Sequence, residues 1–404
     1  MAARTLDPAR PAAESVALFI LLSVSLGHLL NDMMQSALLS IYPVIKAPLG
    51  LSFAQIGIIT LTFQLTASVL QPAVGLYTDK HPKPFSLPVG MASTLCGIIL
   101  LSTAHHFLMV LAAAACIGVG SSIFHPEASR VARLASGGRF GFAQSVFQVG
   151  GNSGQALGPL LMALLVVPYG QGYTAWFGLA ALIGIVVLGN VGLWYRRHMA
   201  ELRARPRKAA EPHGLSQQAV LGSLAALVSL MFADNFYGAS ISSYLPFYLI
   251  DRFGISVSAA QLHLFVFLAA AAVGTFLGGP ISDRIGKKRV LMLAPILVLP
   301  FTLALPHVPL AWTGPVTVAI GLIMAAAFPV IVVYAQELMP GRIGLVGGLF
   351  FGLAFGLGGI GAAVLGWLAD LTSLGFVYQL CAFLPALGLA VLFLPDLDRL
   401  RRSA

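Results

Sequence analysis

Long apolar runs, separated by short polar segments, follow one another along almost the whole chain. A helix needs about 20 apolar residues to cross the roughly 30 Å hydrocarbon layer of a membrane, and most of the runs reach about that length. The pattern therefore predicts an all-α membrane protein with twelve spans. We expect these spans at residues 16–44, 53–77, 86–104, 107–134, 140–167, 174–195, 218–249, 260–281, 289–306, 311–336, 343–369 and 374–395.

One long polar segment divides the expected spans into two groups of six. It runs from Arg196 to Gln218 and is rich in arginine. Such a segment is typical of a solvated linker that rests on anionic lipid head groups. We therefore expect an N-terminal six-helix bundle over 1–195, a basic cytoplasmic linker over 196–217 and a C-terminal six-helix bundle over 218–404.

The two groups of spans resemble each other in sequence. Gly50-Leu51-Ser52 has a counterpart in Gly254-Ile255-Ser256, and Gly75 and Asp79 have counterparts in Gly279 and Asp283 at the same offset. A repeat of this kind is typical of transporters whose substrate site lies between the halves near the membrane midplane. An enzyme is not expected, because the sequence offers no nucleophile–base–orienter set and no metal-ligand spacing. No cofactor or metal is expected either.

Composition and charge agree with a membrane protein and set its orientation. Hydrophobic residues make up 58% of the chain and charged residues only 9%, which excludes a soluble domain. With a cytoplasmic N-terminus, only Lys46 and Arg252 of the 23 lysines and arginines fall on the outer side. This bias predicts that both termini are cytoplasmic. The net charge of +9 therefore reflects topology and lipid contact, and no nucleic-acid partner is expected.

Two polar loops carry a recognisable signature. The segment from Gly279 to Arg289 reads GPISDRIGKKR, and the segment from Gly75 to Lys80 keeps the glycine and the aspartate. Both resemble the cytoplasmic loop signature of the major facilitator superfamily. The resemblance implies the major facilitator fold, with twelve transmembrane helices in two pseudo-symmetric bundles. It also implies a conformational latch that favours the outward-facing state, formed by Gly75, Asp79, Gly279, Asp283 and Arg284.

A more specific resemblance lies in the N-terminal half. The segments Gly27–Ser36, Leu51–Gly57, Phe124–Arg130 and Ala143–Asn152 are similar to the fosmidomycin resistance transporters. The resemblance implies a bacterial inner-membrane protein that exports the phosphonate fosmidomycin in exchange for protons. The antiporter signature is only partly matched, and Ala114 replaces an arginine usual in proton-coupled members. A proton symporter that imports a small organic acid or phosphonate therefore stays open.

Three carboxyl groups are candidates for proton coupling. A charge at the centre of a membrane helix costs about 2.5–3.5 kcal/mol on insertion scales, so its presence needs a reason. Asp32 lies midway along the first span, and Asp234 occupies the matching region of the seventh. Glu127 stands three residues before Arg130, a spacing that lets the two side chains pair. Each carboxyl could take up and release a proton, or serve as a hydrogen-bonded structural group.

A small anionic substrate needs cations or hydrogen-bond donors along its path. Gln148 and Asn152 belong to a polar stripe on the fifth span, although such residues also hold helices together. Arg130 could instead anchor its helix at the cytoplasmic end. The substrate-binding candidates are His28, Asn31, His125, Arg130, Gln148 and Asn152. Because each chain has its own expected pathway, we expect a monomer.

Overall fold

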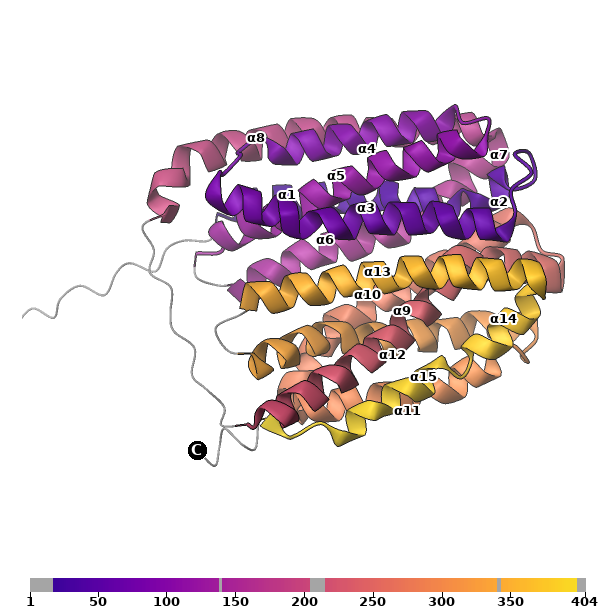
Figure 1. The fold of residues 1–404 in the computed structure, drawn as a ribbon. Helices are drawn as coiled ribbons and strands as arrows, with labels where there is room; N and C mark the ends of the chain where they lie inside the picture. Colours follow the sequence, from indigo (N-terminus) through magenta and orange to yellow (C-terminus); the bar gives the residue numbers. More distant parts are fainter. Residues whose placement is uncertain (1–16, 138–139, 204–214, 340–342, 398–404) are drawn as a thin grey trace, which may run out of the picture.

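The computed structural model describes residues 17–137, 140–203, 215–339 and 343–397, and within these ranges it contains helices and no strand. The N-terminal half, in indigo to magenta in Figure 1, lies beside the C-terminal half. The first half contains α1 (Leu18–Ser40), α2 (Tyr42–Ile45), α3 (Phe53–Lys80), α4 (Ser86–Ser102), α5 (Phe107–Leu134), α6 (Phe140–Leu161), α7 (Val167–Tyr169) and α8 (Phe177–Arg203). The second contains α9 (Gln217–Phe253), α10 (Val257–Ile285), α11 (Lys287–Ala304), α12 (Leu310–Leu338), α13 (Ile343–Leu371), α14 (Leu374–Cys381) and α15 (Leu384–Leu387).

The helices confirm the predicted all-α membrane fold. Ten helical segments within the described ranges are long and apolar enough to cross a membrane, and α4 is a shorter apolar helix. The predicted spans correspond to α1, α3, α4, α5, α6, α8, α9, α10, α11, α12, α13 and the α14–α15 segment.

Two expected boundaries differ from the structure. The last span is interrupted after Cys381, because Pro385 lacks an N–H group and its ring clashes with the carbonyl four residues earlier. The predicted linker begins inside a helix, since α8 continues to Arg203. There the His198 ring stacks on Trp194 and contacts its carbonyl oxygen at 2.9 Å. Residues 204–214 of the linker lie outside the described ranges.

Glycines on α6 bring it unusually close to α1. A methyl group added at Gly154 would lie 2.1 Å from the carbonyl oxygen of Leu29, and one at Gly150 would lie 2.1 Å from that of Ser25. Pro159 on the same helix frees the Gln155 carbonyl oxygen, which accepts a hydrogen bond of 2.6 Å from the Ser36 hydroxyl. The glycines and the proline of α6 thus fix the packing of α1, the helix that carries Asp32.

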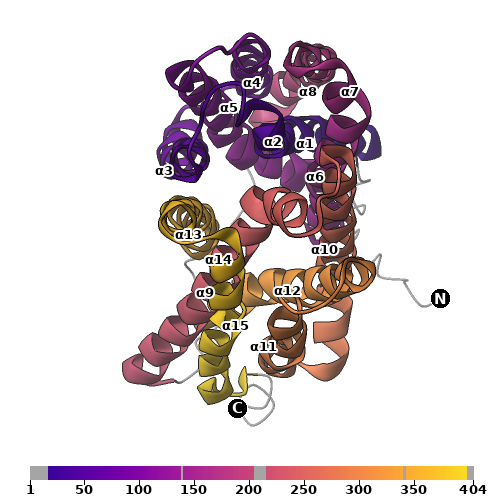
Figure 2. The ribbon, with the colours of Figure 1, turned by 90° about the vertical axis from the view of Figure 1, so that its right-hand side faces the viewer.

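The two halves meet along two helix pairs, α3 with α13 and α6 with α10 (Figure 2). We call the end of the molecule where α3 begins the Lys46 end, and the opposite end the Arg130 end. Near the Lys46 end, a methyl group at Gly57 of α3 would lie 2.6 Å from the carbonyl oxygen of Ala362 on α13. Gly352 and Gly356 lie earlier on α13 than Ala362, and an added methyl group at either position would contact nothing within 4 Å. The α3–α13 pair is therefore tightly packed at the Lys46 end and separates toward the Arg130 end.

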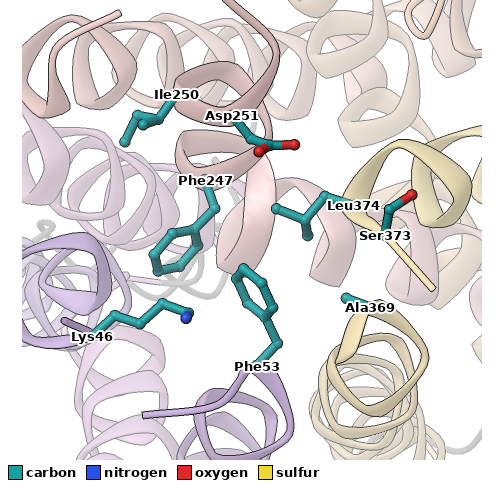
Figure 3. Close-up of a pocket in the computed structure, with 8 residues that line it drawn as sticks. All are labelled: Lys46, Phe53, Phe247, Ile250, Asp251, Ala369, Ser373 and Leu374. Carbon is teal, nitrogen blue, oxygen red and sulfur yellow. The ribbon is translucent and has the colours of Figure 1, made fainter. Parts of the chain in front are cut away.

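Polar contacts reinforce the closed seam at the Lys46 end. The amide of the buried Gln261 on α10 donates a 2.7 Å hydrogen bond to the carbonyl oxygen of Ser40 on α1. A cavity of about 370 Å³ lies between the halves at this end (Figure 3). Its lining residues are Lys46, Phe53, Phe247, Ile250, Asp251, Ala369, Ser373 and Leu374.

Candidate transport site

Asp32 lies in the middle of α1 between two histidine rings. Its Oδ2 atom is 3.4 Å from Nε2 of His28, one helical turn earlier on the same helix. Its Oδ1 atom is 3.4 Å from Nε2 of His125 on α5. Asp32 and His28 are only 3% and 2% exposed. We call His28, Asp32 and His125 the His–Asp–His cluster.

The hydrogen bonds of the two rings determine where protons can sit in this cluster. Nδ1 of His28 is 2.8 Å from the carbonyl oxygen of Phe147, and Nδ1 of His125 is 3.0 Å from that of Ser121. A carbonyl oxygen only accepts hydrogen bonds, so both Nδ1 atoms carry a hydrogen. Each Nε2 atom that faces Asp32 can then donate only if its ring is protonated. The cluster therefore has room for two further protons, one between each ring and the carboxylate.

Three side-chain amides also point at Asp32. Asn31 and Gln35 donate to Oδ1 at 3.2 Å and 3.1 Å, and Gln155 of α6 donates to Oδ2 at 3.2 Å. These amides fill three of the about four lone-pair positions of a carboxylate, and both rings, when protonated, would bring the donors to five. The surroundings are those of an ionised carboxylate. The amides occupy lone pairs of the carboxylate only, and the three possible metal-ligand atoms of the cluster lie within 4.8 Å of one another.

Packing holds the rings in position. The His28 ring stacks on Phe147 of α6 with a centroid distance of 4.0 Å. A methyl group at Gly151 would lie 2.4 Å from that ring, so the glycine provides the space it occupies. The His28 and His125 rings meet edge to face at 5.1 Å.

His125 connects the cluster to the space between the halves. Its side chain is 18% exposed, more than that of Asp32 or His28. The ring of Phe355 on α13 lies 6.2 Å away, between Gly352 and Gly356, where α13 has separated from α3. His125 is therefore the member of the cluster with the most exposed side chain.

Glu127 and Arg130 form the pair that their spacing predicts. Oε1 of Glu127 is 2.9 Å from Nη1 of Arg130. The Ser86 hydroxyl at the start of α4 donates to Glu127 at 3.3 Å, and Arg130 donates to the carbonyl oxygen of Gly75 at 3.5 Å. These contacts tie α5 to α4 and α3. The anchoring and substrate-binding roles of Arg130 and proton coupling by Glu127 all stay predictions.

The other predicted site residues are only partly brought together. Asn31 is fully buried and accepts a 3.4 Å hydrogen bond from Thr94. Gln148 donates to Asn152 at 3.2 Å on α6. Asp234 on α9 is half-buried and makes no hydrogen bond or ion pair with the residues that the structure describes. Asp234 is not among the described groups that contact Asp32, and its role in proton coupling stays a prediction.

The predicted latch residues lie at the Arg130 end. Gly75 is on α3, and Gly279 is on α10, where an added methyl group would contact nothing within 4 Å. Asp283 and Arg284 are exposed and form no ion pair with any described side chain. The side chain of Asp79 lies outside the described part of the chain. The latch role of these residues stays a prediction.

Two contributors to the site, Gln35 and Gln155, are not among the predicted site residues. Gln35 joins Asp32 to α5, because its amide donates to the carboxylate while its oxygen accepts a 3.3 Å hydrogen bond from Ser121. Its spacing of three residues from Asp32 is the signal that could have identified it. Gln155 belongs to the polar stripe, but its contact with Asp32 depends on the packing of α6 against α1.

Comparison with known proteins places this geometry in context. The family model described as Major Facilitator Superfamily matches residues 24–363 and 253–403. The chain is 57% identical over 377 residues to the fosmidomycin resistance protein of Escherichia coli (strain K12), covering 93% of each chain. It is 42% identical over 385 residues to the uncharacterized MFS-type transporter YfnC of Bacillus subtilis (strain 168), covering 95% of this chain and 94% of the relative.

Solved structures share the fold. The bacterial homologue of the human lysosomal transporter Spinster, in its inward-facing and unoccupied conformation, matches with a TM-score of 0.68 and 18% identity. The match covers 98% of this chain and 96% of that one. A mutant of the nucleoside transporter NupG matches with a TM-score of 0.72 and 12% identity, over 94% of this chain and 99% of the other.

Proposed function

The chain belongs to the Major Facilitator Superfamily, and we propose that it exports fosmidomycin or related small anionic phosphonates across the bacterial inner membrane in exchange for protons. The similarity to a fosmidomycin resistance protein, at 57% identity over 93% of each chain, is the observation that carries the substrate class. The charge bias of the loops supports cytoplasmic termini. The Arg130 end then faces the cytoplasm and the Lys46 end faces the periplasm.

Alternating access is the mechanism that fits two bundles joined along one seam. With the proposed topology, the closed Lys46 end and the separated Arg130 end correspond to an inward-facing state. Substrate enters between the halves from the cytoplasm, the halves rock, and substrate leaves on the periplasmic side. Leaving a negative interior is favourable for an anion by about 2.3 kcal/mol per charge per 100 mV, which supports export as the direction.

The His–Asp–His cluster is the proton carrier that we propose. Its two ring-to-carboxylate contacts at 3.4 Å each have room for one proton. Both rings are held by backbone carbonyl groups, so gaining or losing a proton requires no change of tautomer. For exchange, the cluster must bind protons while it is open to the periplasm. It must then release them to the cytoplasm through His125, the member next to the space between the halves.

A second candidate is import of a small anion together with protons, and the charge of the cluster favours it. With both rings protonated and Asp32 ionised, the cluster carries one net positive charge, and with neither ring protonated it carries one net negative charge. A protonated cluster therefore attracts an anion. Binding of protons then promotes binding of the anion, as it does in a symporter. The direction of the pH gradient that drives transport separates the two candidates.

The test is accumulation of labelled fosmidomycin in everted membrane vesicles, whose lumen corresponds to the periplasm. Under the proposed function, an acidic lumen drives accumulation by the unmodified protein. Asp32→Asn and His125→Gln abolish the gradient-driven part. His263→Gln is a matched control, because its Nδ1 atom contacts the carbonyl oxygen of Ala259 at 2.9 Å but, among the described residues, no carboxylate faces the ring.

Each other outcome has a defined meaning. Accumulation driven only by acid outside the vesicles would replace exchange with symport. Gradient-driven accumulation that survives in Asp32→Asn would move the proton to Glu127 or Asp234. No accumulation with either gradient, in vesicles shown to contain the protein, would remove fosmidomycin as a substrate.

A further inference from the structure

The amino-terminal turn of α3 receives its hydrogen-bond partners from both halves of the molecule. The first amides of a helix have no partner within the helix. Ser52 and Gln55 satisfy two amides of this turn locally, since the Ser52 hydroxyl accepts from the Gln55 amide at 3.1 Å and the Gln55 side chain accepts from the Ser52 amide at 2.9 Å. This reciprocal arrangement is a capping box and lies entirely within the N-terminal half.

The other two amides bind a carboxylate from the C-terminal half. Oδ1 of Asp370 accepts from the Phe53 amide at 2.9 Å, and Oδ2 accepts from the Ala54 amide at 2.7 Å. Asp370 lies at the last turn of α13. A negative charge is favourable at a helix N-terminus, where the helix dipole is positive. One aspartate thus completes, across the seam between the halves, a cap that the N-terminal half begins.

The surrounding contacts show how close the two elements are. A methyl group at Gly366, one turn before Asp370, would lie 2.3 Å from the carbonyl oxygen of Phe53. The Tyr244 hydroxyl donates to the carbonyl oxygen of Ala362 on α13 at 2.6 Å and also lies 3.4 Å from the carbonyl oxygen of Phe53. A second carboxylate, Asp251, lines the neighbouring cavity (Figure 3) but makes no hydrogen bond with a described residue.

We propose that Asp370 is a latch for the Lys46 end, which caps α3 only while the halves are closed there. When the halves separate at this end, both bonds to Asp370 break, and the Phe53 and Ala54 amides turn to water. The capping box of Ser52 and Gln55 stays intact, because both partners move together with α3. The latch acts without substrate or protons, and it rests on the proposed function only for its topology, with the Lys46 end on the periplasmic side. With that topology the latch stabilises the inward-facing state.

The expected size follows from measured helix caps. Loss of a cap weakens a helix terminus by an amount equivalent to about a 2- to 30-fold change in an equilibrium constant. Here that change appears in the ratio of closed to open Lys46 ends. Asp370→Ala removes both acceptors, whereas Asp370→Asn keeps one. Both variants should therefore lower the ratio of closed to open Lys46 ends, and Asp370→Ala should lower it more than Asp370→Asn.

The experiment measures opening directly with a reporter cysteine. Ser40 suits this purpose, because it is fully buried, its hydroxyl has no hydrogen-bond partner among the described residues, and it lies at the α1–α10 contact away from Asp370. Ser40→Cys is introduced after Cys96, Cys116 and Cys381 are replaced by alanine. A membrane-impermeant maleimide added from the periplasmic side of whole cells then labels the reporter only when the end opens.

We expect Asp370→Ala to raise the labelling rate about 2- to 30-fold and Asp370→Asn to raise it less. Two controls should stay at the unmodified rate. Ser52→Ala removes the local part of the cap in both conformations, and Asp251→Asn removes a carboxylate of the same cavity. A rate in Asp370→Ala equal to the unmodified rate would overturn the latch. An equal increase in Ser52→Ala would also overturn it, because fraying of α3 alone would then explain the opening.

Discussion

The contact between α6 and α1 makes a specific prediction about Gly154. An alanine at this position places a methyl carbon 2.1 Å from the carbonyl oxygen of Leu29 and 2.9 Å from the Met33 nitrogen. Ordinary contacts begin near 3.4 Å, so α6 must move away from α1 by about 1.3 Å, the difference between 3.4 and 2.1. Both of these atoms belong to the α1 backbone, which cannot turn aside as a flexible side chain can.

The displacement has two consequences. Overpacking of this kind typically destabilises a protein by about 1–3 kcal/mol. It also stretches the 3.2 Å contact between Gln155 and Asp32 beyond hydrogen-bonding range, since Gln155 follows Gly154 on the same helix. We therefore expect Gly154→Ala to lower both the thermal stability and the gradient-driven transport.

Thermal unfolding of the purified protein in detergent measures the first effect, and vesicle accumulation of labelled fosmidomycin measures the second. Gly189→Ala on α8 is the matched control, because a methyl group there contacts nothing within 4 Å. It should leave transport unchanged and raise stability by up to about 1 kcal/mol through helix propensity. Equal unfolding temperatures for the two variants would refute the close approach of α6 to α1.

Two further predictions test the Arg130 end. Glu127→Gln removes the charge of a buried partner of Arg130 and should destabilise the protein by about 1–3 kcal/mol. The pH dependence of vesicle transport should stay as in the unmodified protein. A shifted pH profile would instead make Glu127 a proton carrier. Gly352→Leu fits this conformation, because the position faces open space, but it should obstruct closure of the Arg130 end. Its unfolding temperature should not fall, because leucine is a better helix former than glycine, whereas its transport rate should be lowered. A normal rate would show that α13 does not approach α3 there.

The fold was predictable because hydrophobic length is a local property. Apolar runs define the spans, and each expected span has a helical counterpart in the structure. The interruption of the last span after Cys381 could also have been predicted, since Pro385 cannot continue the helix that precedes it. The continuation of α8 beyond its expected span was not predicted, for a different reason. Residues such as Arg196 and Arg197 are polar but are also good helix formers, so polarity alone did not mark a loop.

The candidate site was predictable only in part. His28 and Asp32 are four residues apart, so their contact follows from helical geometry. His125 was recognised as a candidate residue, but its position against Asp32 depends on how α5 packs on α1. The contact between Asp370 and the start of α3 joins residues 317 positions apart, and no local pattern announces it. Contacts between helices depend on tertiary packing, which a single sequence does not reveal.

The shared cap of α3 also has a consequence for how the protein is made. The Phe53 and Ala54 amides are synthesised 317 and 316 residues before the carboxylate that binds them. At about 5–20 residues per second, the ribosome needs roughly 15–60 s to reach Asp370. During that interval the newly inserted N-terminal half must hold the start of α3 with its own capping box alone. The seam between the halves is therefore one of the last features to form during biogenesis, completed only when the eleventh span enters the membrane.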